Sequence, residues 1–158
     1  WGSFLWQMFE SCTWSRREGD RDGINDKGLM TYDRQGKKDA YFFYKANWNP
    51  RPMVYITSRR HIRRGEAITP VRVYSNCPSV ELKVNGKSLG TRKPNEIRIA
   101  EWQGVTLTPG TNTIEISAGS GNKVVTDLCT WELIPGLKEV HPAPGDKDGK
   151  PVSKVITN

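Results

Sequence analysis

Long apolar runs are scarce in this sequence of 158 residues, and there is no initiator methionine. The longest mostly apolar stretch, residues 1–9, contains Gln7 and is far shorter than the roughly 18 residues of a membrane-spanning helix. We therefore expect no membrane partner. Because the chain begins at Trp1 without a charged and apolar leader, we also expect a processed chain or a fragment.

Cysteine is scarce as well. The three cysteines, Cys12, Cys77 and Cys129, lack the spacing of metal ligands, and their odd number leaves at least one thiol unpaired. A disulfide between Cys77 and Cys129 is open in an oxidising compartment, but their spacing does not decide whether it forms.

Motifs for phosphate and calcium binding are incomplete. The Gly-Lys-Ser sequence at 86–88 matches the end of a phosphate-binding loop, but Glu81 stands where that loop needs glycine. Asp20 and Asp22 begin a calcium-loop pattern that Ile24 interrupts at the third ligand position. The sequence therefore predicts no metal site and no cofactor.

The formal net charge is +7, and its excess lies mostly in residues 51–134. Arginines at 59, 60, 63 and 64 surround His61, on what we interpret as a solvated β-hairpin. No RNA-binding or DNA-binding motif accompanies this cluster. We therefore expect no nucleic-acid partner.

The first 50 residues have an α/β pattern. Residues 2–9 are almost continuously apolar, which is typical of a strand buried on both faces. Residues 11–36 are polar and rich in glycine, which predicts a long loop with an extended stretch at 29–32. Helical spacing at 37–48 ends at Asn49-Pro50 and predicts a helix of three turns.

From Met53 the apolar residues alternate with polar ones. Seven short strands are predicted, at 54–57, 71–74, 80–84, 97–99, 105–107, 113–116 and 124–133. About seven strands in a segment of this length are typical of a β-sandwich. Asn85-Gly86 predicts a hairpin, because both central positions of a type I′ turn need positive φ. Proline and glycine make 135–158 a predicted linker or tail.

Paired carboxylates are the usual machinery for cleaving a glycosidic bond, and they must be held at a fixed separation. The acids near the aromatic cluster are Glu10, Glu18, Asp20 and Asp26. They follow a strand end or lie in a loop, and nothing in this chain fixes their separation. We therefore assign no catalytic residue here.

Tryptophan faces can stack on sugar rings, so each tryptophan is either a core residue or a binding residue. Trp102 and Trp131 lie on predicted strands, which favours the core, whereas Trp14 and Trp48 leave both interpretations open. Trp6 lies at the end of the predicted first strand, where the active-site residues of a barrel gather.

The sequence motifs carry a family resemblance. Residues 1–9, 17–20, 23–29, 32–34 and 38–48 closely resemble the end of the (β/α)8 barrel in bacterial β-galactosidases of glycoside hydrolase family 2. Residues 52–131, including the motifs at 80–90 and 109–114, resemble the immunoglobulin-like domain that follows that barrel. A chain of this length is too short for a complete barrel, which needs roughly 200 residues.

The resemblance implies roles for three residues. Trp6 belongs to the eighth barrel strand and faces the terminal sugar in the intact enzyme. Asn25 and Lys27 match an Asn-x-Lys element that contacts the sugar carboxylate in related β-glucuronidases, so a β-glucuronidase is the alternative parent. Glu10 stands where the family usually has aspartate. Both catalytic glutamates of the family come from earlier strands, upstream of Trp1.

We therefore expect a mainly β chain with a barrel remnant at 1–50, an immunoglobulin-like sandwich at 52–134 and a tail at 135–158. Its expected function is that of an accessory module of a β-galactosidase-like enzyme, inactive alone. An independent carbohydrate-binding module is the alternative. The expected partners are the rest of the barrel, carbohydrate and a second copy through the apolar run. By resemblance, the compartment is periplasmic or extracellular.

Overall fold

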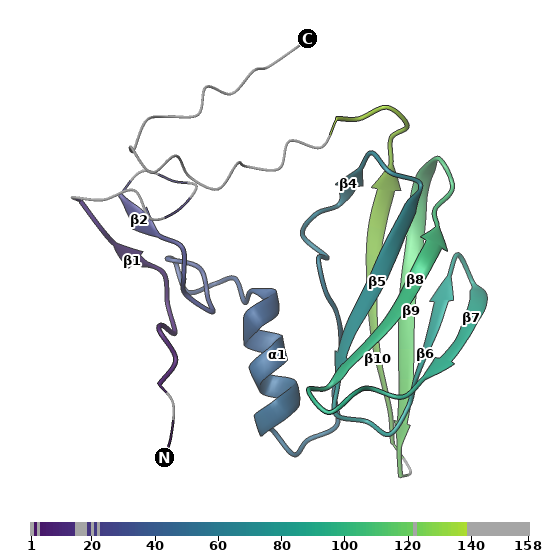
Figure 1. Ribbon diagram of the computed structural model, residues 1–158, viewed down its shortest axis with the longest axis horizontal. Helices are drawn as coiled ribbons and strands as arrows, with labels where there is room; N and C mark the ends of the chain where they lie inside the picture. The colour runs from purple at the N-terminus through teal and green to yellow at the C-terminus, as the bar shows by residue number, and fades with distance from the viewer. Residues whose placement is uncertain are drawn as a thin grey trace. The chain divides into compact units, whose positions relative to one another are not determined.

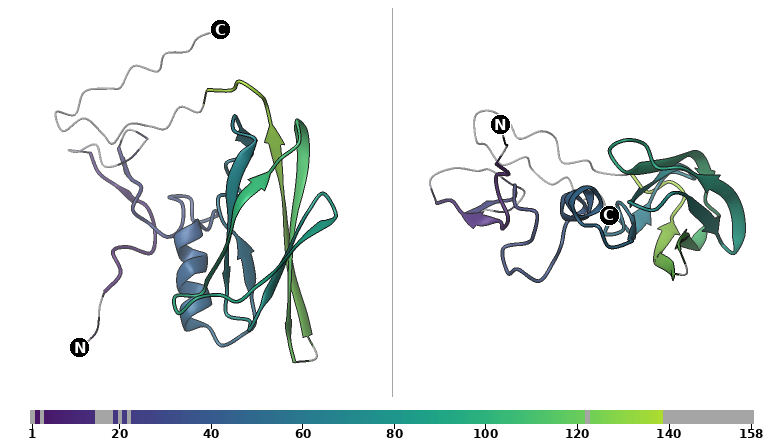
Figure 2. Two further views of the ribbon diagram at one scale, coloured as in Figure 1. Left: turned by 45° about the vertical axis from the view of Figure 1, so that its right-hand side comes forward. Right: turned by 90° about the horizontal axis from the view of Figure 1, so that it is seen from below.

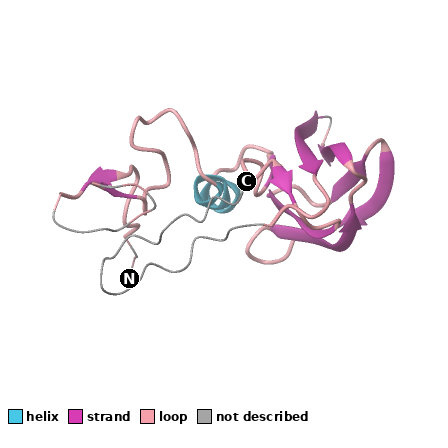
Figure 3. Ribbon diagram, turned by 90° about the horizontal axis from the view of Figure 1, so that it is seen from above, coloured by secondary structure: helices cyan, strands magenta, loops and turns pink. Residues whose placement is uncertain are grey.

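The computed structural model describes residues 2, 4–14, 19, 21, 23–121 and 123–138. These residues fall into two compact units, of which the first ends at Tyr41 and the second begins at Phe42. The described residues are mainly β, with one helix, as the sequence predicts (Figure 3). The predicted tail from 139 onward lies outside the described residues, and the domain limits 1–50, 52–134 and 135–158 stay predictions.

The second unit is a β-sandwich (Figure 1). One sheet has three antiparallel strands in the order β3 (Val54–Ile56), β5 (Ile68–Ser75) and β8 (Ile99–Thr106). The other has the order β4 (Arg63–Arg64), β10 (Lys123–Leu133), β9 (Gly110–Ser120), β6 (Val80–Val84) and β7 (Lys87–Arg92). Neighbours in this sheet are antiparallel, except that β4 runs parallel to β10.

Period-two alternation produces the core between the sheets. Val71 and Val73 of β5, Leu82 of β6, and Ile114 and Ile116 of β9 are all buried in one cluster. Burying a side chain of this size contributes about 1.5 to 3 kcal/mol, so these positions drive the folding of the unit.

The prediction that two tryptophans belong to the core is confirmed. Trp102 and Trp131 are 3% and 1% exposed. Arg64 of β4 is also buried, with its guanidinium 3.6 Å from the centre of the Trp131 ring. A cation held over an aromatic face is stabilised by the ring quadrupole.

Four of the predicted strands correspond to β3, β5, β6 and β10, and a fifth to the longer β9. The remaining two, at 97–99 and 105–107, are the two ends of one strand, β8. The sequence does not reveal β7, because all six of its residues are exposed and they show no alternation of apolar and polar side chains. It also misses β4, which has only two residues.

The hairpin at Asn85-Gly86 is confirmed, with φ of 51° and 77° at the two residues between β6 and β7. A buried amide ties this turn to the turn before β9. The side-chain oxygen of Asn112 accepts hydrogen bonds from Asn85 Nδ2 at 3.0 Å and from the Thr108 amide at 2.9 Å. In return, the Asn85 side-chain oxygen accepts the Thr113 amide at 2.8 Å. Both turns are therefore fixed by the same side chains.

The helix α1 (Asp39–Trp48) begins two residues later than predicted and ends as predicted. Asp39 lies in its first turn and Lys45 in its last, where their charges complement the helix dipole. From Phe42 onward the helix packs on the three-stranded sheet (Figure 2). The Phe42 ring stacks on Tyr55 with a centroid distance of 3.7 Å.

Asn76 holds the connection from α1 to β3. Its side-chain nitrogen donates to the carbonyls of Asn49 and Arg51, at 2.8 and 2.9 Å. Its oxygen accepts the Met53 amide at 2.8 Å. All its hydrogen-bonding atoms are therefore used, and the helix is fixed in place on the sandwich.

The prediction of a solvated β-hairpin at the arginines of residues 59–64 is wrong. Arg63 and Arg64 form β4, which pairs with the distant strand β10. Arg59 donates to Asp127 at 2.7 Å and to the Leu128 carbonyl at 2.8 Å. Arginines 59 and 64 therefore take part in the packing of the sandwich, because each reaches a specific partner on β10.

The open question of a disulfide is resolved by the side chains. Cys77 and Cys129 are both buried and both carry free thiols. Burial raises the pKa of the Cys129 thiol to about 11, so this thiol is protonated and unreactive at neutral pH.

The first unit departs from the sequence prediction. The described residues of the apolar run do not form a buried strand, since Phe4 is fully exposed and Trp6 is 75% exposed. Only the end of the run pairs with another segment, through hydrogen bonds between Met8 and Met30 and between Glu10 and Met30. A strand buried on both faces needs neighbours along both edges, and this segment has one short neighbour.

The described part of the first unit also contains two short strands. β1 (Ser11–Cys12) pairs antiparallel with β2 (Ile24–Asn25). The predicted extended stretch at 29–32 is confirmed at Met30, which bridges Phe9 on one side and Lys37 on the other. Among the described residues, no helix combines the length and the apolar character that a bilayer crossing requires.

Candidate functional site

The three predicted sugar-binding residues all lie in the first unit. Asn25 is buried in β2, Lys27 is exposed two residues later, and Trp6 is exposed in the N-terminal segment. The side-chain oxygen of Asn25 accepts the Lys27 amide at 3.0 Å. This hydrogen bond closes a turn of residues 25–27, which we call the Asn25–Lys27 turn, and an Asn side chain favours such a turn by bonding the backbone two residues on.

Backbone pairing brings this turn close to the N-terminal segment. The Gln7 carbonyl accepts a hydrogen bond from the Leu29 amide at 3.0 Å. Gln7 directly follows Trp6, and Leu29 lies two residues after the turn. The Trp6–Gln7 peptide bond is cis. Residues about twenty positions apart in the sequence are therefore neighbours through their main chains.

Gly28 makes the close approach sterically possible. A Cβ atom at this position would lie 2.1 Å from the Glu10 amide nitrogen and 2.3 Å from the Phe9 carbonyl carbon. Both atoms belong to the backbone and cannot move aside as a flexible side chain can. Only glycine therefore lets the chain after Lys27 pass against residues 9 and 10.

Glu10, which the sequence places at the end of the predicted first strand, has a network of contacts that the sequence does not reveal. Its carboxylate is buried, and it forms ion pairs with Arg21 and Lys38. It also accepts the Tyr32 amide at 2.9 Å. No spacing rule points to this network, because the partners lie 11, 22 and 28 positions away.

The charge state of Glu10 follows from these contacts. Burial by itself raises the pKa of a carboxyl group, but here the hydrogen bonds from Lys38 and the Tyr32 amide, with the charges of Lys38 and Arg21, outweigh it. The pKa of Glu10 is therefore lowered below its usual value. A carboxylate held ionised in this way is a poor proton donor at neutral pH, so Glu10 is unsuited to be the general acid of a hydrolase.

Lys38 joins this network to the Asn25–Lys27 turn. Its ammonium group contacts the Glu10 carboxylate and also donates to the carbonyl of Asp26, the central residue of the turn. Its own amide donates to the Leu29 carbonyl at 2.9 Å. Lys38 therefore holds the loop both at the turn and just beyond it.

The described residues contain no catalytic pair of carboxylates that includes the other candidate acids. Glu18, Asp20 and Asp22 lie outside the described residues, and Asp26 is partly exposed in the turn. Within the described part of the chain, no group of three His, Cys, Asp or Glu side chains is placed to hold a metal ion. The described polar groups of this site are the Asn25–Lys27 turn and the ion pairs of Glu10.

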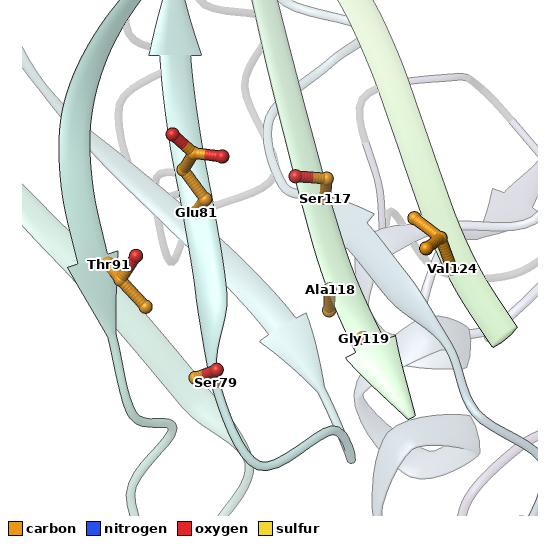
Figure 4. Close-up of a pocket in the computed structure, with 7 residues that line it drawn as sticks. All are labelled: Ser79, Glu81, Thr91, Ser117, Ala118, Gly119 and Val124. Atoms are coloured by element: carbon orange, nitrogen blue, oxygen red, sulfur yellow. The ribbon is translucent and has the colours of Figure 1, made fainter. Parts of the chain in front are cut away.

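The second unit has a shallow hollow on the outer face of its five-stranded sheet (Figure 4). Its volume is about 250 Å³. It is lined by Ser79, Glu81, Thr91, Ser117, Ala118, Gly119 and Val124. No aromatic ring lines it for stacking on a sugar, and Glu81 already accepts a hydrogen bond from Ser88 at 2.7 Å. The first unit is therefore the better candidate site.

Two further tryptophans are exposed. Trp14 is 92% exposed just after β1, and Trp48 is 69% exposed at the end of α1, where it lies against Tyr44 with a centroid distance of 4.7 Å. Neither lines the hollow on the sandwich.

Comparisons with known proteins agree with the resemblance seen in the sequence. Residues 66–126, less than half of the chain, match the model of a domain of unknown function, DUF4982. A β-glucuronidase of Bacteroides fragilis is 44% identical over 133 residues, which are 84% of this chain and 19% of that protein. The β-galactosidase BoGH2A of Bacteroides ovatus is 30% identical over 97 residues, 59% of this chain and 11% of that protein.

A solved structure shares the fold. The crystal structure of a Bacteroides uniformis β-glucuronidase superposes with a TM-score of 0.74 and 28% identity, over 82% of this chain and 16% of that one. The chain thus spans about a fifth or less of the length of the relatives it matches. Its resemblance to β-glucuronidases and β-galactosidases of glycoside hydrolase family 2 is confirmed.

Proposed function

We propose that this chain is a C-terminal piece of a family 2 glycoside hydrolase that removes terminal β-linked sugars. In this proposal the chain supplies a sugar-binding loop and a supporting sandwich, while the reacting carboxylates come from preceding residues. The observation that carries it is 44% identity to a β-glucuronidase across 84% of the chain. The long motifs at 1–48 and the sandwich both fall within the resemblance.

The exposed apolar surface supports the proposal of a larger parent protein. Phe4, Trp6 and Met8 are 102%, 75% and 48% exposed, and they occupy every second position of one segment. A contiguous apolar segment of this kind is unfavourable in water and is typical of a surface that another part of a protein covers. Neighbouring strands of a complete barrel would cover it.

A β-glucuronide is the substrate that we favour for the parent enzyme. Lys27 is an exposed cation on a turn fixed by Asn25, and a carboxylate is the part of a glucuronide that a galactoside lacks. Charge-assisted hydrogen bonds to a carboxylate are stronger than those to a hydroxyl. The relatives include both enzyme types, so a β-galactoside is the alternative substrate.

The test is hydrolysis by the complete gene product that contains this chain. We expect turnover of nitrophenyl β-glucuronide, and no turnover by the 158-residue chain alone. Lys27→Ala should lower kcat/KM for the glucuronide at least about tenfold, because a charged hydrogen bond contributes about 1.5 to 3 kcal/mol. The same substitution should leave the galactoside rate nearly unchanged.

Lys87→Ala, on the exposed strand β7, is the matched control and should not alter either rate. If the enzyme prefers the galactoside and Lys27→Ala changes neither rate, the substrate is assigned as a β-galactoside instead. Turnover by the isolated chain would overturn the assignment of the reacting groups to preceding residues.

The sandwich is proposed to support the catalytic barrel. An independent carbohydrate-binding module is the alternative, and calorimetry with galacto- and glucurono-oligosaccharides distinguishes the two. If residues 42–138 only support the barrel, the oligosaccharides should give no heat of binding to them. If they form a binding module, a heat of binding should be measured. We also propose a periplasmic or extracellular location, which fractionation of cells producing the complete protein would test.

A further inference from the structure

Lys38 is the one described lysine whose ammonium group contacts both a buried carboxylate and the backbone of the candidate binding turn. It reaches Glu10 on one side and the Asp26 carbonyl on the other. Its side chain is only 18% exposed, and the Glu10 carboxylate is 3% exposed. The contacts are thus shielded from water and from screening by salt.

The carbonyl that Lys38 holds belongs to the residue between Asn25 and Lys27. The Asn25 side chain fixes the Lys27 amide, and Lys38 fixes the peptide group between them. Just beyond, Gly28 lies against the backbone of Glu10. The Asn25 contact therefore shapes the turn itself, and the contacts of Lys38 and Gly28 set where the turn lies relative to residues 9 and 10.

We infer that Lys38, held by Glu10, is a positioning residue that sets the Asn25–Lys27 turn at the distance from the Trp6 segment that a bound sugar acid requires. This inference rests on the proposed function. In this inference Lys38 is not a sugar ligand, because its ammonium group is directed to Glu10 and Asp26. It acts through the turn, as the residues supporting a binding site do.

A hydrophobic residue cannot replace Lys38. Lys38→Met keeps the length of the side chain but leaves the Glu10 carboxylate and the Asp26 carbonyl without this donor. Lys38→Arg keeps the charge and offers several donors. Lys37→Met is the matched control, because Lys37 is the adjacent lysine and lies 5.1 Å from the centre of the Tyr41 ring instead of in this network.

Steady-state kinetics of the complete gene product gives the first readout. Lys38→Met should raise KM for nitrophenyl β-glucuronide about 10- to 100-fold, since a shift of about 1 Å in a positioned group can cost this much. The KM for the neutral galactoside should change far less, and Lys38→Arg should recover most of the loss. Equal KM values for the Lys38→Met and Lys37→Met variants would overturn the inference.

Hydrogen exchange gives a second readout that does not depend on activity. In Lys38→Met, the Lys27 amide should exchange at least about tenfold faster, while amides of β9 and β10 keep their rates. Unchanged exchange at Lys27 overturns the inference even if the enzyme is active. If the complete protein hydrolyses neither glycoside, the proposed function fails, and exchange at Lys27 still decides whether Lys38 positions the turn.

Discussion

The two units of this chain are stabilised by different kinds of contact. The sandwich has a cluster of seventeen buried residues between its sheets. In the first unit, Leu29 is the only buried hydrophobic side chain among the described residues before Phe42, and the buried Glu10 carboxylate forms ion pairs with Arg21 and Lys38. Apolar burial scales with area and supports a fold by itself, whereas ion pairs mainly fix geometry. We therefore expect the sandwich to contribute most of the unfolding free energy and the ion pairs of the first unit to fix its local geometry.

The largest expected effect comes from removing a side chain from the centre of the sandwich core. Trp131→Ala should cost about 3 to 5 kcal/mol of unfolding free energy, because it leaves a large cavity and removes the ring beneath Arg64. Chemical denaturation followed by circular dichroism measures the loss. Leu128→Ala, on the same strand but 56% exposed, is the control and should cost about 0.5 kcal/mol or less. Similar losses for both variants would contradict a sandwich stabilised by its core.

A smaller effect tests the polar contribution to the sandwich. Asn112→Ala should cost about 1 to 3 kcal/mol, because the Thr108 amide and the Asn85 side chain lose a buried partner. The same denaturation experiment measures it, with the exposed Thr130→Ala on β10 as control. An Asn112→Ala variant as stable as the control would show that these turns do not need the amide.

The smallest effect concerns acid, and it should distinguish the two units. The lowered pKa of Glu10 means that its ion pairs stabilise the first unit above the usual pKa of a glutamate, near 4.5, and that this contribution is lost as the pH falls through the lowered value. The protection of the Tyr32 amide, which bonds to Glu10, relative to its intrinsic exchange rate should therefore fall in acid before the protection of β9 amides does. Glu10→Gln should remove this pH dependence. An acid-dependent loss of Tyr32 protection that persists in Glu10→Gln would assign the effect to another group.

The sandwich was largely predictable because its signals are local. Alternation at 80–84 and 124–133 and the Asn85-Gly86 pair are properties of adjacent residues, and each produced the expected strand or turn. β7 was missed because an exposed edge strand needs no alternation. The residues of the Asn25–Lys27 turn were identified through resemblance, and their sugar contacts stay predictions.

The first unit was less predictable because its contacts join distant residues. No periodic pattern links Glu10 to Lys38, and the network follows from the path of the loop between them. The apolar run at 2–9 was expected to be a buried strand, but burial depends on neighbours, which composition does not supply. Local sequence thus predicted the apolar character of this segment but not its environment.

The strand β7 forms one edge of the five-stranded sheet. Its pairing with β6 shifts register between Glu81 and Lys83, and Gly90 has a φ of 87°. Lysine and arginine at the two ends of the strand add like charges along this border. An incoming strand would meet a bent, cationic border that cannot continue the hydrogen-bond ladder. Growth of the sheet into fibrils is therefore discouraged at this border.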